Sequence, residues 1–223
     1  MKPLTFINGF FIAGEIVKKN KKYFISVAGN IGSGKSSLTR LAAKEFGWVP
    51  YYESVQNNPY LSDFYKNMKR WSFQLQVYFL AHRFSTHKKI IDSKKSVIQD
   101  RSIYEDVEIF ARNLYLMGRM EARDYRNYRS LFYEMTGYLK PPDLIVYLKA
   151  NVNTLMKQIR ARGRAFEKAI EKHYLERLNS SYGQWISGYK LGKVITIDTN
   201  DLDFVKNKEH FIIILNKITK ALN

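Results

Sequence analysis

The stretch GNIGSGKS at residues 29–36 constrains this chain more than any other part of its sequence. It matches the pattern G-x-x-x-x-G-K-[ST] and follows the apolar, β-rich run of residues 23–28. Residues 37–46 come next and have the composition of a helix. A strand, a glycine-rich loop and a helix in this order are the context that a phosphate-binding loop requires. The sequence therefore predicts a nucleotide-binding site.

Each residue type in this loop has a chemical reason. Glycines let the backbone curl until successive N–H groups point at phosphate oxygens, and the helix adds the positive end of its dipole. Lys35 is expected to reach the β- and γ-phosphates of ATP, and the Ser36 hydroxyl to ligate Mg²⁺. A glycine-rich turn with an incidental lysine is the alternative, but it leaves the closing Gly-Lys-Ser run unexplained. The residues expected to hold the phosphates are Gly29, Asn30, Ile31, Gly32, Ser33, Gly34, Lys35, Ser36 and Ser37.

Strand-like apolar runs alternate with helical stretches along the chain. Strands are predicted at residues 23–28, 48–52, 96–99, 144–148 and 194–197, and helices at 37–46, 60–67, 70–92, 104–116, 121–138, 152–162, a stretch ending near 189, and 204–222. This alternation predicts a three-layer α/β fold of the P-loop NTPase class, in which helices flank a central five-stranded parallel sheet. Ligands of such sheets bind beyond the carboxyl ends of the strands. Gly29, Glu53 and Asp100 follow predicted strand ends, so we expect them to converge there.

The length of 223 residues suits one domain, which we expect at residues 23–223. Residues 1–22 are interpreted as an N-terminal extension, either flexible or the result of a start codon assigned too early. Four of their five lysines follow the apolar part and only Lys2 precedes it, which is the reverse of the order in a secretory signal. No stretch is apolar and long enough to span a bilayer, and the chain has no Cys. We therefore expect a cytoplasmic protein without a membrane partner.

The formal net charge of +17 raises the question of an anionic partner. The lysines are spread along the chain, whereas a nucleic-acid binder more often clusters them on one face. A general lysine-rich bias is therefore favoured over a nucleic-acid partner. The four His residues have no metal-ligand spacing, so Mg²⁺ bound with ATP is the one metal implied.

Five stretches give the chain a resemblance to the deoxynucleoside kinase family. They are GNIGSGKS, ESVQNNPYL at 53–61, RWSFQLQVYFLAHR at 70–83, QDRSIYED at 99–106 and RARGRAFE at 160–167. They occur in the family's order and at its spacings. Within the family the chain looks most like the bacterial deoxyadenosine/deoxycytidine kinase type, with bacterial deoxyguanosine kinase a close second. The resemblance implies transfer of the γ-phosphate of ATP to the 5′-hydroxyl of a deoxyribonucleoside in nucleotide salvage, and a homodimer.

The resemblance also assigns roles around the reacting oxygen. Glu53 would be the general base for the 5′-hydroxyl, a task that a positioned carboxylate can perform. Arg101 would lie beside it, keep it ionised and steady phosphate charge, while Asp100 would face Mg²⁺ through water. Arg83 and Asp106 fall where purine- and cytidine-accepting members carry an Arg–Asp pair that thymidine-preferring members lack. The pair favours deoxyadenosine or deoxycytidine and leaves deoxyguanosine open.

Four further positions would bind the substrate. By resemblance, Gln76 would read the base edge, Phe110 would stack on the base, and Tyr65 and Glu167 would hold the sugar 3′-hydroxyl. Taken one at a time, most of Tyr65, Gln76 and Phe110 are better explained as ordinary helix residues in a core or at its edge. It is their occurrence as an ordered set that favours a function.

Arg160, Arg162 and Arg164 alternate near the end of a predicted helix, with Gly163 between the last two. A basic helix end is one reading, because cations are favoured there. The preferred reading is a lid, because arginines stabilise the charge that spreads over a phosphoryl group in transfer. The resemblance makes Arg162 and Arg164 the stronger candidates and Arg160 the weaker.

Two other functions are compatible with a phosphate loop. A nucleoside-monophosphate kinase of the same fold would need extra arginines for the acceptor's phosphate, and it would not need Glu53 as a base. A nucleic-acid-binding P-loop ATPase is kept open by the charge, although such a motor usually needs a longer chain or an added domain.

Overall fold

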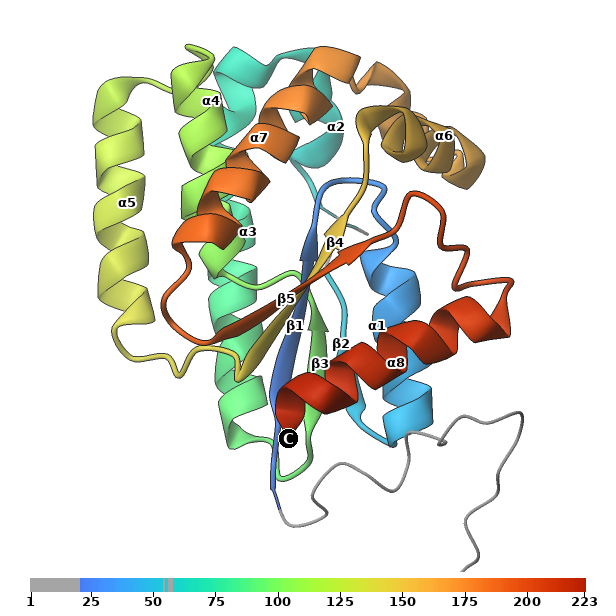
Figure 1. Cartoon of the computed structure of the whole chain (residues 1–223). Coiled ribbons are helices and arrows are strands. Elements are labelled where there is room, and N and C mark those ends of the chain that lie inside the picture. The colour runs from blue at the N-terminus through green and yellow to red at the C-terminus, as the bar shows by residue number, and fades with distance from the viewer. Residues whose placement is uncertain (1–20, 54, 56–57) are drawn as a thin grey trace, which may run out of the picture.

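The computed structural model describes residues 21–53, 55 and 58–223. Five parallel strands form one sheet in the order β2-β3-β1-β4-β5, and helices cover both of its faces (Figure 1). The predicted three-layer α/β fold is therefore confirmed. In chain order the elements are β1 (Phe24–Gly29), α1 (Lys35–Phe46), β2 (Val49–Tyr51), α2 (Leu61–Lys66), α3 (Met68–Asp92), β3 (Val97–Asp100), the π-helix η2 (Asp106–Ala111), α4 (Arg112–Leu116), α5 (Ala122–Thr136), β4 (Leu144–Lys149), α6 (Val152–Arg162), the 3₁₀-helix η3 (Ala165–Ala169), α7 (Lys172–Gly188), β5 (Lys193–Asp198) and α8 (Lys208–Leu222).

The central strand β1 is buried along its whole length, which explains its continuous apolar sequence. It pairs with β3 on one side and with β4 on the other. The chain first crosses from β1 towards β2 and β3, and later returns to the opposite side for β4 and β5. Parallel sheets bind ligands where the strand order reverses in this way. The topology thus directs a ligand to the carboxyl end of β1.

The two faces of the sheet carry separate cores. Ile25 and Val27 of β1 pack with α1 and α8 on one face. Ala28 packs with α6 and α7 on the other face. A further apolar cluster joins α2, α3, η2 and α5 beside the sheet. This outer cluster forms a helical wall next to the carboxyl ends of the strands.

Two helices differ from their predicted form. The predicted helix 104–116 contains the π-helical segment η2, a rare form that often marks functional sites. The last helix was predicted from residue 204 but begins at Lys208. Its start is fixed by Asn207, whose side chain accepts hydrogen bonds from the backbone N–H groups of Glu209 and His210.

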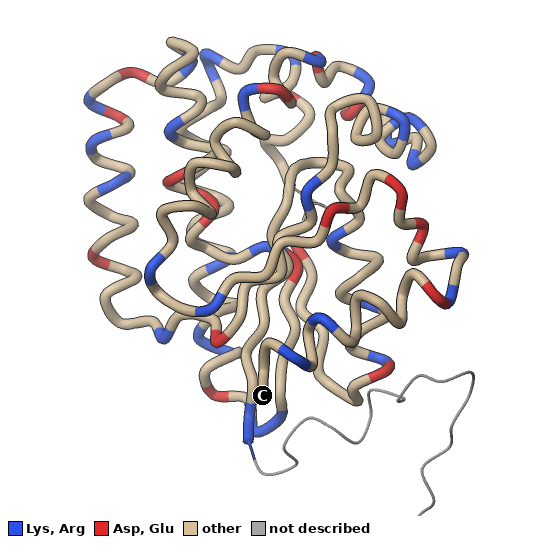
Figure 2. The backbone as a smooth tube through the Cα atoms, viewed as in Figure 1, with Lys and Arg blue, Asp and Glu red and all other residues tan. Residues whose placement is uncertain are grey.

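Some predictions fall outside the described residues. The N-terminal extension at 1–22 does so except for Lys21 and Lys22, and so do Ser54, Gln56 and Asn57 of the stretch that follows Glu53. Among the helices that are described, none is long and apolar enough to cross a membrane. Lys and Arg are scattered over most of the described elements (Figure 2).

Candidate active site

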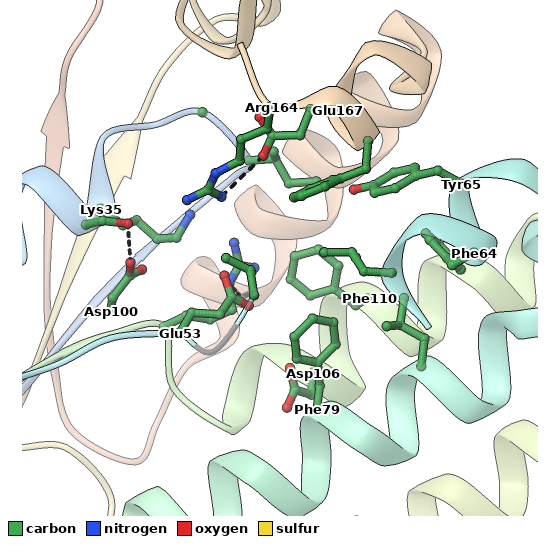
Figure 3. A pocket seen from close by; sticks show the side chains of 18 of the residues that line it. Lys35, Glu53, Phe64, Tyr65, Phe79, Asp100, Asp106, Phe110, Arg164 and Glu167 are labelled. Atoms are coloured by element: carbon green, nitrogen blue, oxygen red, sulfur yellow. Dashed lines mark hydrogen bonds and ion pairs between the residues drawn. The ribbon is translucent and has the colours of Figure 1, made fainter. Parts of the chain in front are cut away.

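A cavity of about 640 Å³ lies where the strand order reverses. One end is polar and is built from the phosphate loop and the residues after β2 and β3 (Figure 3). The other end is aromatic and lies against the helical wall. A volume of this size suits a small organic ligand with both polar and apolar parts.

The phosphate loop forms the polar end. Lys35 is buried, and its Nζ donates a hydrogen bond to the carbonyl oxygen of Asn30 at 2.9 Å. Burial, and then the charge of Arg101, lower the pKa of Lys35 to about 8, against the opposing effect of Asp100. Of the predicted loop residues, Ile31, Gly32, Lys35 and Ser36 line the cavity, whereas Gly29, Asn30, Ser33, Gly34 and Ser37 do not.

Ser36 and Asp100 lie together at the same end. The Ser36 hydroxyl donates a hydrogen bond to Oδ2 of Asp100. The other oxygen, Oδ1, is buried and has no hydrogen-bond partner among the described residues. Magnesium prefers oxygen ligands and keeps several waters. A hydroxyl and a carboxylate oxygen in this position therefore fit the predicted magnesium site.

Glu53 follows β2 and points into the cavity between two arginines. Oε1 of Glu53 contacts a guanidinium nitrogen of Arg83 and lies 3.3 Å from Nε of Arg101. Burial opposes ionisation of Glu53, but Arg101, followed by Arg83 and Lys35, outweighs it and lowers the pKa to about 2. The carboxylate is therefore ionised at neutral pH, and the predicted Glu53–Arg101 neighbourhood is present.

Arg83 and Asp106 form the predicted ion pair, from α3 to η2. Arg83 also reaches Glu53, a contact that the sequence did not predict. Asp106 is 1% exposed. Burial raises its pKa to about 6, although Arg83 opposes the shift. Arg83 thus links the reacting end of the cavity to the end where a base would lie.

The aromatic end holds three of the predicted substrate residues: Tyr65, Gln76 and Phe110. The Phe110 ring lies on the Arg101 guanidinium, with 4.4 Å between Cζ and the ring centroid. Oε1 of Gln76 is buried and has no hydrogen-bond partner among the described residues. An amide in this condition is prepared to recognise a polar group of a ligand.

The lid follows α6. Arg162 donates to the buried carboxylate of Glu167 through Nε at 3.0 Å and Nη2 at 2.6 Å, and Arg164 donates through Nη1 at 3.4 Å. Arg162, Arg164 and Glu167 all line the cavity, and Figure 3 labels the last two. Arg160 does not; it is exposed. Two residues apart on a helix, Arg160 and Arg162 point to nearly opposite sides. The predicted placement of Arg160 at the nucleotide is therefore not supported.

Several residues at or near the site were not predicted, among them the cavity-lining Phe64, Phe79 and Phe166. Tyr174 of α7 lines the cavity. Glu105 and Tyr182 surround Arg101 from behind, where Tyr182 accepts from Nη1 at 2.9 Å and donates to Glu105 at 2.7 Å. The sequence contains a weak indication that Glu105 is near the site, because it lies in the QDRSIYED stretch four residues after Arg101. No sequence pattern indicates that Tyr182 lies near Arg101, because the two are 81 residues apart along the chain.

Comparisons with known proteins agree on one family. The family model described as "Deoxynucleoside kinase" matches residues 25–223. The deoxyadenosine/deoxycytidine kinase of Bacillus subtilis is 38% identical over 205 residues, covering 91% of this chain and 94% of that protein. The deoxyguanosine kinase of the same organism is 38% identical over 200 residues, covering 86% and 94%.

A solved structure is also similar. The deoxyadenosine kinase of M. mycoides, solved with dCMP and dCDP bound, superposes with a TM-score of 0.79 at 29% identity and covers 88% of this chain and 99% of that one. The match with the family model runs from β1 to the last residue and so includes the phosphate loop, Glu53, Arg101 and the lid. The chain belongs to the deoxynucleoside kinase family.

Proposed function

We propose that the protein uses ATP to phosphorylate the 5′-hydroxyl of deoxyadenosine and deoxycytidine, with deoxyguanosine as a further substrate. The observation that carries this base preference is the buried Arg83–Asp106 pair beside Gln76. Arg83 offers donors to a ring nitrogen or keto oxygen, and an ionised Asp106 accepts from an exocyclic amino group. Thymine has no amino group, so it would leave Asp106 buried and unpaired on that side.

The polar end of the cavity would bind ATP, the phosphate donor. Lys35 and the lid arginines, Arg162 and Arg164, are the charges available to the β- and γ-phosphates. Ser36 would hold Mg²⁺ directly, and Asp100 would act on it through water, as the family resemblance implies. When bound, the ion neutralises phosphate charge.

Glu53 is proposed to orient the 5′-hydroxyl and to take its proton. A carboxylate with a pKa of about 2 is too weak a base to remove a hydroxyl proton before the new bond forms. Phosphoryl transfer has a loose transition state, so the proton need not leave early. Glu53 then accepts it as the oxygen becomes bonded to phosphorus. Until that proton transfer, the positive charge of Arg101 keeps Glu53 ionised.

The remaining roles concern the sugar and the base. Tyr65 and Glu167 would bind the 3′-hydroxyl, and Phe110 would stack on the base. Burial, with Tyr174 and Glu167 nearby, raises the pKa of Tyr65, so its hydroxyl stays a hydrogen-bond donor. Tyr65 also stacks on Phe166 of the lid, with ring centroids 6.1 Å apart. Substrate binding and lid position are thereby connected.

Relatives support the proposal without settling the base. Kinases named for deoxyadenosine with deoxycytidine and for deoxyguanosine reach the same 38% identity to this chain. We further propose that residues 23–223 act as one domain in a cytoplasmic homodimer, as the family resemblance implies. A monophosphate acceptor is disfavoured because its phosphate would meet the ionised Glu53.

The test is a panel of the four deoxynucleosides, each incubated with the purified protein, labelled ATP and Mg²⁺. The proposal predicts the highest kcat/KM with deoxyadenosine or deoxycytidine and the lowest with thymidine. A protein that prefers thymidine would refute the assigned base preference.

A further inference from the structure

Arg101 occupies an unusual backbone position. Among the described residues it is the one non-glycine residue with a positive φ, at 67°. Such a conformation persists only where the surroundings determine it. Its backbone N–H donates to the carbonyl oxygen of Val27 at 3.0 Å, and its Nη2 donates to that of Gly29 at 3.4 Å. The arginine at the reacting end is therefore held by contacts outside the cavity.

One of these contacts is a directed relay through Tyr182. Nη1 of Arg101 donates to the Tyr182 hydroxyl at 2.9 Å, and that hydroxyl donates its single hydrogen to Oε2 of Glu105 at 2.7 Å. Oε1 of Glu105 accepts from the backbone N–H of Ser102 at 2.9 Å. Tyr182 and Glu105 are both fully buried. Since Arg101 has no acceptor to offer, the Tyr182 oxygen must accept from it, and the hydroxyl hydrogen remains available to Glu105.

The Tyr182 hydroxyl also keeps two charges apart. Nη1 of Arg101 and Oε2 of Glu105 are 3.9 Å from each other, too far for a direct hydrogen bond. Opposite charges attract strongly in a buried setting. Without the hydroxyl, Glu105 would draw the guanidinium towards itself and away from Glu53, whose Oε1 lies 3.3 Å from Nε on the other side.

The same helix holds the phosphate loop. Nδ2 of Asn30 donates to the carbonyl oxygen of Leu175 at 3.0 Å and to Oδ1 of Asn179 at 2.7 Å. Asn179 is anchored in turn, because its Nδ2 donates to the carbonyl oxygen of Ala150 at 2.9 Å. Leu175, Asn179 and Tyr182 are spaced by four and three residues, so they share one face of α7. That face contacts both halves of the polar end.

We propose that α7 sets the distance between the phosphate loop and Arg101, with Asn179 and Tyr182 as positioning residues and Glu105 as the anchor of Tyr182. None of the three lines the cavity, so each acts through another residue. The inference rests on the role proposed above for Arg101. Small displacements of a group that stabilises a transition state cost much of the rate.

The first test is Tyr182→Phe, assayed with the deoxynucleoside that gives the highest turnover. We expect kcat to fall by ~10- to 100-fold, while KM for ATP changes less than about twofold because the phosphate loop is untouched. Tyr189→Phe is the matched control. Its hydroxyl, at the end of the same helix, is buried and has no hydrogen-bond partner among the described residues, so its loss should leave kcat unchanged.

A second substitution tests the attraction between Glu105 and Arg101. In the Tyr182→Phe background, Glu105→Gln removes the charge that draws Arg101 away, so the double variant should recover part of the lost kcat. If the hydroxyl were only a source of stability, the second change would give no recovery or a further loss. A double variant no more active than Tyr182→Phe would show that Glu105 does not draw Arg101 away, and would overturn the claim that the Tyr182 hydroxyl keeps the two apart.

Asn179→Ala tests the other contact and should have the opposite kinetic signature. We expect KM for ATP to rise severalfold and kcat to stay within about twofold. Wild-type kinetics in both Tyr182→Phe and Asn179→Ala would overturn the inference. If Tyr182→Phe does not fold, Asn179→Ala is decisive by itself: a raised KM for ATP supports the inference, and wild-type kinetics overturn it.

Arg101→Gln separates this inference from the proposed function. If Arg101→Gln is as active as wild type, the role of Arg101 and the inference fall together. If Arg101→Gln is impaired while Tyr182→Phe and Asn179→Ala behave as wild type, the role of Arg101 stands and the inference alone is wrong.

Discussion

Nε of Arg101 lies 3.3 Å from Oε1 of Glu53. Arg101 directly follows β3, and Glu53 lies two residues beyond the end of β2. Their contact places a permanent positive charge against the carboxylate. Together with Arg83 it keeps the pKa of Glu53 low although the group is largely buried. The chemistry of the site follows from this contact, because an ionised carboxylate can hold a hydroxyl by its proton.

The Arg83–Asp106 pair should control the choice of base. We expect Arg83→Met combined with Asp106→Ala to raise kcat/KM for thymidine relative to deoxyadenosine by about tenfold, in line with ~1–3 kcal/mol for a buried polar group left unpaired. Total turnover should also fall, since Glu53 loses one of its two arginines, so the ratio is the quantity to measure. Arg70→Met, at an exposed position of the same helix, is the control. An unchanged ratio would mean that the pair does not read the base.

Gly34 should be irreplaceable in the phosphate loop. Its φ is +90°, and a Cβ there would lie 2.9 Å from Cζ of Phe204. We expect Gly34→Ala to weaken ATP binding by about tenfold, because the loop or the Phe204 ring packed against it must move to relieve the clash. Titration calorimetry with ATP measures this directly.

Gly47→Ala provides the matched control for Gly34→Ala. Gly47 also has a positive φ, of 68°, but nothing lies within 4 Å of the position of its Cβ. This variant should lose about 1 kcal/mol of stability from the backbone alone and bind ATP normally. Equal ATP affinity in the two alanine variants would rule out the crowding by Phe204 as the reason for the glycine.

Ionisation of Asp106 should lower the free energy of unfolding as the pH rises from 5 to 7. Its pKa is about 6 in the folded protein against an ordinary 3.8, so the folded state binds the proton more tightly than the unfolded state. The proton therefore stabilises the fold at pH 5, and this contribution, about 1 kcal/mol, is lost as the pH passes through 6. Glu53 adds nothing in this window, because its lowered pKa affects stability only below about pH 4.5.

Asp106→Asn isolates this effect in urea unfolding at pH 5 and pH 7. The amide does not titrate, so the variant should show a smaller fall in the free energy of unfolding than the wild type. Buried His87, whose pKa is lowered by burial, pushes stability in the opposite direction but does so in both proteins and cancels. Parallel pH dependences would contradict the raised pKa of Asp106.

The sequence was sufficient for the sheet and the phosphate loop because both depend on local patterns. The run YFISVA is apolar at every position but Ser26, as a strand buried on both faces requires. The glycines of the loop motif adopt positive φ angles, so the motif itself indicates the conformation of the loop. The convergence of Glu53 and Asp100 followed from the topology alone, since parallel strands end at one edge.

Contacts between distant side chains could not be predicted in this way. Arg83 reaches both Asp106 and Glu53 because of how α3 lies against the sheet, which no local pattern encodes. The hold of Tyr182 on Arg101 likewise depends on the packing of α7. The position of Arg160 also depends on the helix, which turns Arg160 and Arg162 to different sides, so that Arg160 is exposed and does not line the cavity.

The most direct test of the account is the turnover of Glu53→Gln with the preferred deoxynucleoside, beside its affinity for ATP. We expect kcat to fall by ~10²–10⁴-fold while ATP affinity stays within about twofold, and we expect Glu45→Gln, at an exposed position of α1, to match the wild type. A Glu53→Gln variant that phosphorylates its substrate at nearly the wild-type rate would contradict the role proposed for Glu53.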